Sequence, residues 1–178
     1  MIPRKYLCDY RIDEQITPKG AIRTKAVYIG AEYVLSPAVT AKNKQILLCL
    51  SVLSVPLYIS AMVPELTAAR QVYVLAPFAF SALPLFMMLV AAMDLFRVNG
   101  PMSRFEADRR SSRLPACAMI TALLSGGAFL ALIISVIITK PDIQTGDIIF
   151  AVFSAIICVI SVSAFIITRK IKPSAQKI

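Results

Sequence analysis

Few side chains in this 178-residue sequence could perform chemistry, and their spacing argues against a catalytic or metal-binding centre. The sequence contains no His, which removes the commonest general base and the commonest metal ligand. Its 4 Cys residues occur singly, at Cys8, Cys49, Cys117 and Cys158, so neither a C-x-x-C redox pair nor a disulfide framework is expected. We therefore predict that the protein is not an enzyme and that it holds no metal and no cofactor.

The acidic and methionine residues do not complete such a centre either. Asp94 directly follows an apolar run, and Arg97 is its expected partner three positions later. Met87, Met88 and Met93 lack the Met-x-x-Met spacing of a metal pathway, so adaptable packing explains them better. No Gly-rich phosphate-binding loop follows a strand pattern. The chemistry that remains is that of packing, charge and membrane contact.

The composition is that of a membrane protein. Hydrophobic residues make up 58% of the chain and its mean hydropathy is +0.74, whereas soluble domains are roughly 45–50% apolar. Four apolar runs are long enough to cross a hydrocarbon core as helices, at about 46–63, 72–93, 115–139 and 148–168. The predicted fold class is therefore all-α membrane, with a four-transmembrane-helix bundle over residues 46–168.

Basic residues are distributed asymmetrically about these runs. Of the 19 Lys and Arg residues, all but Arg70 and Lys140 lie in residues 1–45, 94–113 and 169–178. Because basic loops stay in the cytoplasm, both termini, the linker 94–113 and the basic tail 169–178 are predicted to be cytoplasmic (N-in, C-in). A long polar segment ahead of the first apolar run is not a signal-peptide pattern, which favours a multi-pass protein of the cell inner (cytoplasmic) membrane.

Several basic residues beside the spans are expected either to contact anionic lipid headgroups or only to fix the topology. They are Arg104, Arg109, Arg110, Arg113, Arg169, Lys170 and Lys172. Ser103 and Glu106 match a capping box, which predicts a short surface helix over about 104–112. The net charge of +9 is interpreted as contact with the lipid bilayer and not with nucleic acid, because the charges cluster beside the apolar runs.

Residues 1–45 are predicted to form a small β-rich cytoplasmic segment. Polar and apolar residues alternate from Tyr6 to Ile12, residues 17–20 have turn chemistry, and residues 24–35 form a second β-rich stretch. Gly30 marks a bulge or bend in that stretch. Such a ribbon buries too little to be stable alone, so it should lean on the membrane surface, the linker or a partner. The alternative is a partly ordered tail.

Helix breakers and small residues indicate how the spans pack. Pro56 and Pro84 lie near the middle of their runs and predict kinks at the bilayer midplane. Small residues at four-residue spacing predict a closely packed face on the third span. They are Ala118, Ala122 and Gly126 in one row and Gly127, Ala131 and Ser135 in the next. Transporter sites also combine non-ideal helices at one depth, but the four runs contain no charged side chain.

Three functions stay open on these observations. The favoured one is a non-catalytic integral membrane protein that acts as a subunit or scaffold of a membrane complex, with another membrane protein or a second copy of itself as partner. The first alternative is a small transporter or channel for a neutral or apolar solute. The second alternative is an immunity protein that protects the membrane against a toxin.

Overall fold

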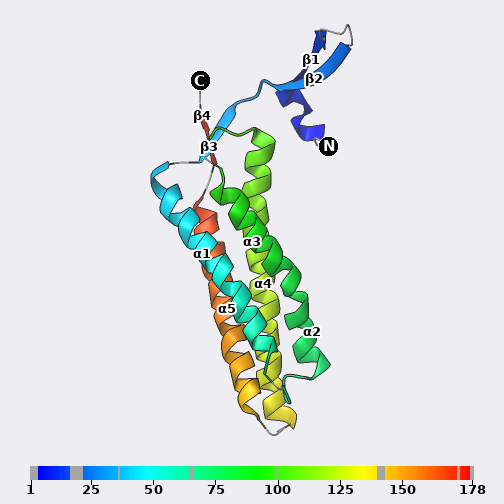
Figure 1. The fold of residues 1–178 in the computed structure, drawn as a ribbon, viewed down its shortest axis with the longest axis vertical. Helices are drawn as coiled ribbons and strands as arrows, with labels where there is room; N and C mark the ends of the chain where they lie inside the picture. The colour runs from blue at the N-terminus through cyan, green and yellow to red at the C-terminus, as the bar shows by residue number, and fades with distance from the viewer. Residues whose placement is uncertain are drawn as a thin grey trace.

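The computed structural model describes residues 4–16, 22–35, 37–64, 66–98, 100–139, 143–171 and 173–176. Strands occur near the two ends of the chain and five α-helices lie between them (Figure 1). The elements are η1 (Arg4–Asp9), β1 (Tyr10–Ile16), β2 (Ile22–Tyr28), β3 (Glu32–Leu35), α1 (Pro37–Met62), α2 (Val72–Phe80), α3 (Ala82–Phe96), α4 (Arg104–Thr139), α5 (Thr145–Lys170) and β4 (Pro173–Gln176).

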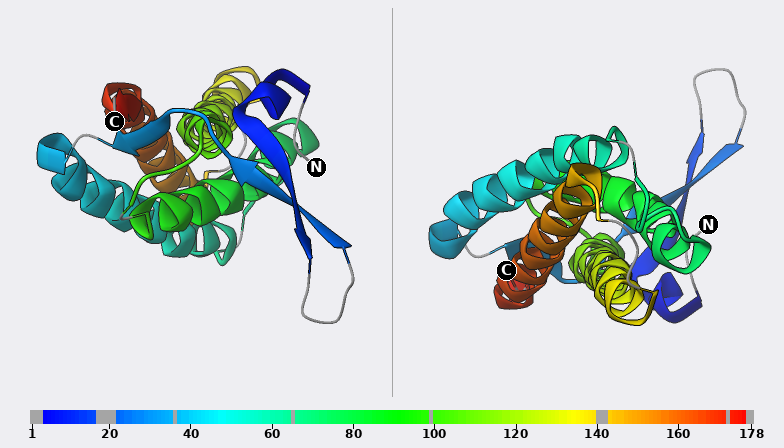
Figure 2. Two further views of the ribbon diagram at one scale, coloured as in Figure 1. Left: turned by 90° about the horizontal axis from the view of Figure 1, so that it is seen from above. Right: turned by 90° about the horizontal axis from the view of Figure 1, so that it is seen from below.

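Four segments are long and apolar enough to cross a membrane: Ala41–Met62, Val72–Phe96, Arg104–Ile138 and Thr145–Arg169. This confirms a mostly helical chain with four candidate spans and a small strand segment, as expected of a multi-pass membrane protein. The spans form one elongated bundle, and α2 and α3 together make the second span (Figures 1 and 2). Each loop reverses the direction of the chain, so the fourth span ends at the same end of the bundle at which the first span begins. η1 and all four strands lie at this end.

Buried residues along the spans repeat every three or four positions. On α4 the buried positions from Leu114 onward are Leu114, Ala118, Thr121, Ser125, Ala128, Leu132 and Ser135. On α5 they include Asp147, Phe150, Ser154, Ile157, Ser161, Ala164 and Thr168. A repeat that averages 3.5 residues keeps one stripe facing a neighbouring helix, as in left-handed coiled coils. Many members of both stripes are Ala, Ser or Thr, whose small side chains let helices approach closely in lipid.

Most hydroxyl groups on these stripes are satisfied within the bundle. Ser51 Oγ donates to the Leu47 carbonyl at 2.8 Å, and Ser125 Oγ donates to the Thr121 carbonyl at 2.8 Å. Ser154 Oγ instead reaches from α5 to the Ser125 carbonyl on α4 at 2.8 Å. The Ser161 hydroxyl is the exception, because it is buried without a hydrogen-bond partner in the described part of the chain. The stripe is thus a packing surface, and the Ser154 hydroxyl adds a cross-helix hydrogen bond near its middle.

The third span differs from its expected form. The surface helix predicted over 104–112 is not separate from the span, because α4 runs without a break from Arg104 to Thr139. Its start is capped, with the Glu106 N–H donating to Ser103 Oγ at 3.4 Å. Pro115 lies inside α4 and removes one backbone donor, but the helix continues past it. The four linker arginines from Arg104 to Arg113 therefore lie on a helical extension of the span.

We use the name "head" for residues 4–16 and 22–35, Met102 and residues 173–176, which lie together at one end of the bundle (Figure 1). Strands β1 and β2 form an antiparallel ribbon whose register pairs Tyr10 with Tyr28. Strand β3 pairs antiparallel with β4, so the C-terminal segment joins the N-terminal one. Tyr33 also exchanges two backbone hydrogen bonds with Met102, each of 3.0 Å. Three distant parts of the chain thus meet in the head.

The strand predictions for the head hold in part. The alternation from Tyr6 to Ile12 predicted a strand, but η1 occupies Arg4–Asp9 and β1 begins only at Tyr10. The side chain of Tyr6 is buried against α4, a contact that outweighs the local pattern. The bend expected at Gly30 does separate β2 from β3. The turn predicted at residues 17–20 lies outside the described residues.

Candidate functional site

The head rests on the first turns of α4. The Tyr6 ring packs edge-on against Phe105, with ring centroids 5.2 Å apart, and the Tyr6 hydroxyl donates to Asp108 Oδ2 at 2.8 Å. Tyr6 is only 4% exposed. A small ribbon has too little buried area to be stable alone, and these contacts supply a support for it. Of the three supports considered from the sequence, the structure supplies the linker that leads into the third span.

Gly30 and Tyr28 fix the bend between the ribbon and the rest of the head. The Tyr28 hydroxyl donates to the Ala31 carbonyl at 2.7 Å and accepts from the Arg104 N–H at 3.0 Å. A Cβ atom on Gly30 would lie 2.7 Å from that hydroxyl oxygen and 3.0 Å from Cβ of Asp9. Glycine is therefore required here by close approach, because any side chain would displace the tyrosine. The bend sets the direction in which the ribbon leaves the bundle.

The β1–β2 ribbon extends beyond the bundle and forms a sheet of two strands (Figure 1). The Ile29 N–H donates to the Asp9 carbonyl at 2.9 Å, which makes this pair a hydrogen-bonded one. Because such pairs alternate with non-hydrogen-bonded pairs, the backbone groups of Ile12 and Ala26 point outward at the two edges. Outward N–H and C=O groups of an edge strand are a template for pairing with another chain. The ribbon is the candidate interaction site of this protein.

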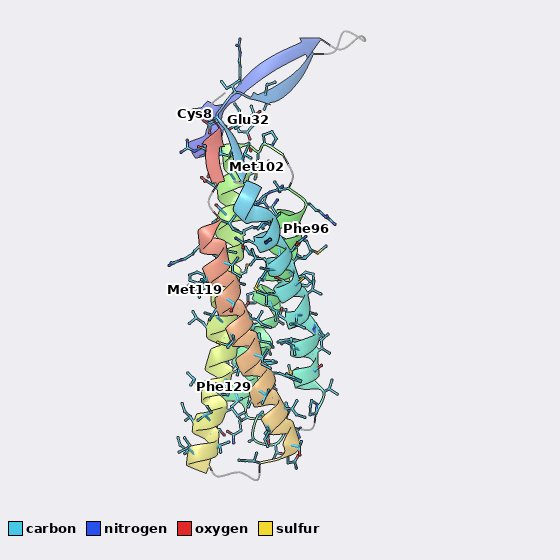
Figure 3. All side chains as sticks on the ribbon, turned by 90° about the vertical axis from the view of Figure 1, so that its left-hand side faces the viewer. Cys8, Glu32, Phe96, Met102, Met119 and Phe129 are labelled. Atoms are coloured by element: carbon cyan, nitrogen blue, oxygen red, sulfur yellow. The ribbon has the colours of Figure 1, made fainter. Side chains whose placement is uncertain are left out.

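Figure 3 places the side chains of Cys8, Glu32 and Met102 at the head and those of Met119 and Phe129 along the bundle. Cys8 is exposed. Cys49, Cys117 and Cys158 are free thiols. Among the described residues, no group of three or more His, Cys, Asp or Glu side chains is placed to hold a metal ion.

The second span is interrupted for one residue at Ser81, between α2 and α3. Ser81 keeps helical angles (φ −68°, ψ −16°) and its N–H still donates to the Pro77 carbonyl at 3.1 Å, so this break is a local irregularity and not an unwound segment. Pro84 follows three residues later, and its missing N–H leaves the Phe80 carbonyl without its helical donor. Pro84 itself is buried, whereas Pro56 is exposed on the unbroken helix α1. The two prolines predicted as midplane kinks therefore lie in different settings, and only Pro84 adjoins a break.

Side chains from two helices bond the backbone at this break. Ser81 Oγ donates to the Phe78 carbonyl at 2.6 Å, and the Tyr58 hydroxyl of α1 donates to the same carbonyl at 3.2 Å. The Tyr58 and Phe78 rings stack, with centroids 4.7 Å apart and planes 8° apart. Phe78 also contacts Phe150 of α5 at a centroid distance of 4.7 Å. The aromatic cluster and the hydroxyl donors therefore stabilise the backbone at the break, which favours a kink of fixed geometry.

Asp147 is a buried acidic residue that the sequence analysis did not single out. It lies near the start of α5, at the end of the bundle opposite the head, and is 2% exposed. Its Oδ1 accepts from the N–H groups of Thr67 at 3.1 Å and Ala69 at 2.9 Å, and its Oδ2 accepts from the Gln144 N–H at 3.1 Å. The carboxylate thereby ties the loop between the first two spans to the loop before the fourth. Gln144 and Asp147 form a capping box, a spacing that could have signalled this role.

The six small residues predicted to pack on the third span are only partly on its buried stripe. Ala118 and Ser135 are buried, and Ser135 Oγ donates to Gln71 Oε1 at 2.6 Å. A Cβ on Gly126 would lie 3.1 Å from Sγ of Cys158, whereas one on Gly127 would meet nothing within 4 Å. Ala122 and Ala131 are half-buried. Rows of four-residue spacing drift around a helix of 3.6 residues per turn, so they leave the stripe within two or three turns.

The predicted lipid-contacting basic residues divide into three groups. Arg109, Arg110 and Arg113 line a cavity between α3 and α4. Arg104 is exposed at the start of α4, and the guanidinium of Arg169 lies 4.6 Å from the centroid of the Phe165 ring. Lys170 ends α5 without a described side chain, and Lys172 lies outside the described residues.

Comparison with known proteins found no matching family model, no matching curated protein and no matching solved structure. The functional reading of this chain therefore depends on its own geometry.

Proposed function

We propose that this protein is a non-catalytic subunit or scaffold of a membrane complex, and that its β1–β2 ribbon binds the partner. The observation that carries the proposal is the ribbon itself, which extends from the bundle with two open edges. Side-chain hydroxyls along the buried stripes bond backbone carbonyls, which is a packing role. Addition of a strand to an open edge is a common mode of protein recognition.

Two proline variants of the full chain test the proposal. Ala26→Pro and Ile12→Pro each remove one outward N–H, on opposite edges of the ribbon, without removing an internal ladder bond. C-terminally tagged protein is extracted in a mild detergent and examined by native mass spectrometry. We expect a stoichiometric partner with the wild-type chain, either a second membrane protein or another copy, and its loss in one of the two variants.

Val27→Pro is the matched comparison, because position 27 lies in a hydrogen-bonded pair. Proline there removes an N–H that bonds β1, so the two strands of the ribbon separate locally. It should release the partner whichever edge is used. Hydrogen exchange of the ribbon amides checks that the two outward variants keep the ladder. A partner retained by all three variants would refute the ribbon as the binding site, and a wild-type chain that carries no partner would refute the subunit role.

We also propose that the head faces the cytoplasm of a cell whose inner membrane contains the bundle. The support is the asymmetry of charge, since all but two of the 19 Lys and Arg residues lie in residues 1–45, 94–113 and 169–178, and the described strands of the first and last of these ranges lie in the head. Cys8 is an exposed reporter at that end. In intact cells, a membrane-impermeant maleimide should leave a chain with Cys8 alone unlabelled and should label a chain with Ile143→Cys alone, because residue 143 is exposed at the opposite end.

A small transporter or channel for a neutral or apolar solute is the second candidate. The irregular turn between α2 and α3 favours it, because non-ideal helices at mid-depth recur in transporter sites. Ser81→Ala would remove a donor from the break while keeping its volume nearly unchanged. A flux that the wild type carries and this variant loses, at equal protein abundance, would favour transport over the subunit role.

A further inference from the structure

A charged cavity lies between α3 and α4 where the spans meet the head end. It has a volume of about 150 Å³ and is lined by Ala91, Asp94, Glu106, Arg109, Arg110 and Arg113. Its position is that of a membrane boundary, because the apolar part of α4 begins at Leu114 and α3 is apolar up to Asp94. Ala91 is the apolar member of the lining and lies nearly one turn deeper along α3 than Asp94.

The cavity carries charges of both signs that are not paired with one another. Three guanidinium groups and two carboxylates line it, and no ion pair joins any of these five side chains, all of which the structure describes. Arg110 donates to the backbone carbonyl of Asp94 at 3.4 Å, so the two helices are in contact here. Glu106 and Arg110 lie four residues apart on one helix, a spacing that allows an ion pair, but they do not form one. Both kinds of charge remain available to a ligand.

We propose that this cavity binds the headgroup of a zwitterionic phospholipid, phosphatidylethanolamine. The phosphate would accept hydrogen bonds from the arginines, which suit phosphate oxygens with their planar forks of donors. The primary ammonium, a few bonds away, would donate to Asp94 and Glu106. A purely anionic headgroup satisfies the arginines but is repelled by the two carboxylates. A choline headgroup has no N–H to donate to them, and its three methyl groups make it bulkier.

The lipid source follows from where the cavity lies. A lipid in the adjacent leaflet presents its headgroup at this depth, and its acyl chains can run along exposed apolar residues of α3 such as Met87. Binding of a soluble phosphate compound would not use that surface. The inference is independent of the partner proposed for the β1–β2 ribbon, because the two sites share no residue.

The test uses full-length protein in a mild detergent with an equimolar mixture of phosphatidylethanolamine, phosphatidylcholine and phosphatidylglycerol of identical acyl chains. Native mass spectrometry counts each lipid on the folded protein in one spectrum. We expect the wild type to retain the ethanolamine lipid about tenfold more than either competitor, the scale expected of a few charge-assisted hydrogen bonds. Because the readout is a ratio within one sample, a partial loss of folded protein does not change it.

Variants assign the two ends of the headgroup. Asp94→Asn with Glu106→Gln should lower the ratio of ethanolamine to glycerol lipid about tenfold, because the carboxylates both attract the ammonium and repel the anion. Glu106→Gln alone is the milder variant, since that side chain is exposed, and it should lower the ratio in the same direction. Arg104→Gln with Arg169→Gln is the matched control, because both arginines lie outside the cavity, and it should leave the ratio unchanged.

Three results would overturn the proposal. One is equal retention of the ethanolamine and choline lipids by the wild type. Another is an unchanged ratio of ethanolamine to glycerol lipid in the carboxylate variants. The third comes from a separate arm with soluble glycerophosphoethanolamine, where binding as tight as that of the intact lipid would assign the cavity to a soluble compound.

Discussion

Replacing Asp147 by Asn should loosen the end of the bundle opposite the head without dissolving the four spans. The wild-type carboxylate is 2% exposed and accepts three backbone hydrogen bonds, two of them on Oδ1. An asparagine side chain of the same shape has one carbonyl oxygen. If that oxygen stays with Thr67 and Ala69, the amide NH₂ faces the Gln144 N–H, so two donors oppose each other.

The magnitude follows from those contacts. Two charge-assisted hydrogen bonds become neutral ones, at a cost of about 1 kcal/mol each, and the third donor loses its acceptor, at a cost of about 1 to 2 kcal/mol. The favourable interaction of the negative charge with the dipole of α5 is lost as well, which adds roughly a few tenths of a kcal/mol to the cost. We expect the free energy of unfolding to fall by about 3 to 4 kcal/mol. For a chain of this size that corresponds to a decrease in Tm of about 6 to 16 °C.

The assay is thermal unfolding in a mild detergent, together with amide hydrogen exchange over residues 66–71. The variant should exchange faster in that loop while the amides of the central turns of α4 keep their protection. Thr145→Ala is the matched control, because Thr145 is exposed on the same first turn of α5 and should change Tm by no more than about 2 °C. An Asp147→Asn protein with the Tm and the loop protection of the wild type would refute the role assigned to the carboxylate.

Three further predictions test the packing of the bundle and the head. Gly126→Ala should lower the free energy of unfolding by about 1 kcal/mol, because its Cβ would lie 3.1 Å from Sγ of Cys158, and adding Cys158→Ala should restore the stability. Gly127→Ala should be neutral or stabilising, because its Cβ would meet nothing within 4 Å, and thermal unfolding of all these variants measures the difference. Tyr58→Phe keeps the ring stack but removes the hydroxyl donor at the α2–α3 break, so it should cost about 1 kcal/mol in the same assay, and an unchanged Tm would argue that the break needs no such donor. Removal of residues 173–178 deletes β4, so hydrogen exchange should show β3 losing protection while the β1–β2 ribbon keeps its own, and an unaltered β3 would contradict the pairing.

The sequence was sufficient to determine the number of candidate spans. An apolar run of about 20 residues has few alternatives to a membrane-crossing helix, because every backbone polar group must be bonded within the segment. The sequence also contained the 3.5-residue repeat of buried positions, such as Ala118, Thr121 and Ser125 on α4. Choosing rows of four-residue spacing instead selected Gly127, beside which a Cβ would meet nothing within 4 Å. The period of the pattern, and not the size of individual residues, identifies the packed face.

Local patterns were less informative in the head. Alternation predicted a strand from Tyr6 onward, but Tyr6 instead packs on Phe105, about a hundred residues away in the sequence. The bend at Gly30 could be expected from the residue type, yet the cause, a tyrosine hydroxyl 2.7 Å from where a Cβ would stand, is a tertiary contact. Strand pairing depends on which partner the fold supplies, so a pattern of period two does not determine the pairing.

Three features were decided by the tertiary structure alone: the pairing of β3 with β4, the hydrogen bonds of Asp147 to the loop between the first two spans, and the charged cavity between α3 and α4. Each joins residues that are far apart in the chain, as in the hydrogen bond from the Ala69 N–H to Asp147 across 78 positions. A sequence pattern reports what its own neighbourhood can form, which for this protein is four apolar helices with a basic end. Which loops and ends then meet depends on how the helices pack, and that packing is a property of the whole chain.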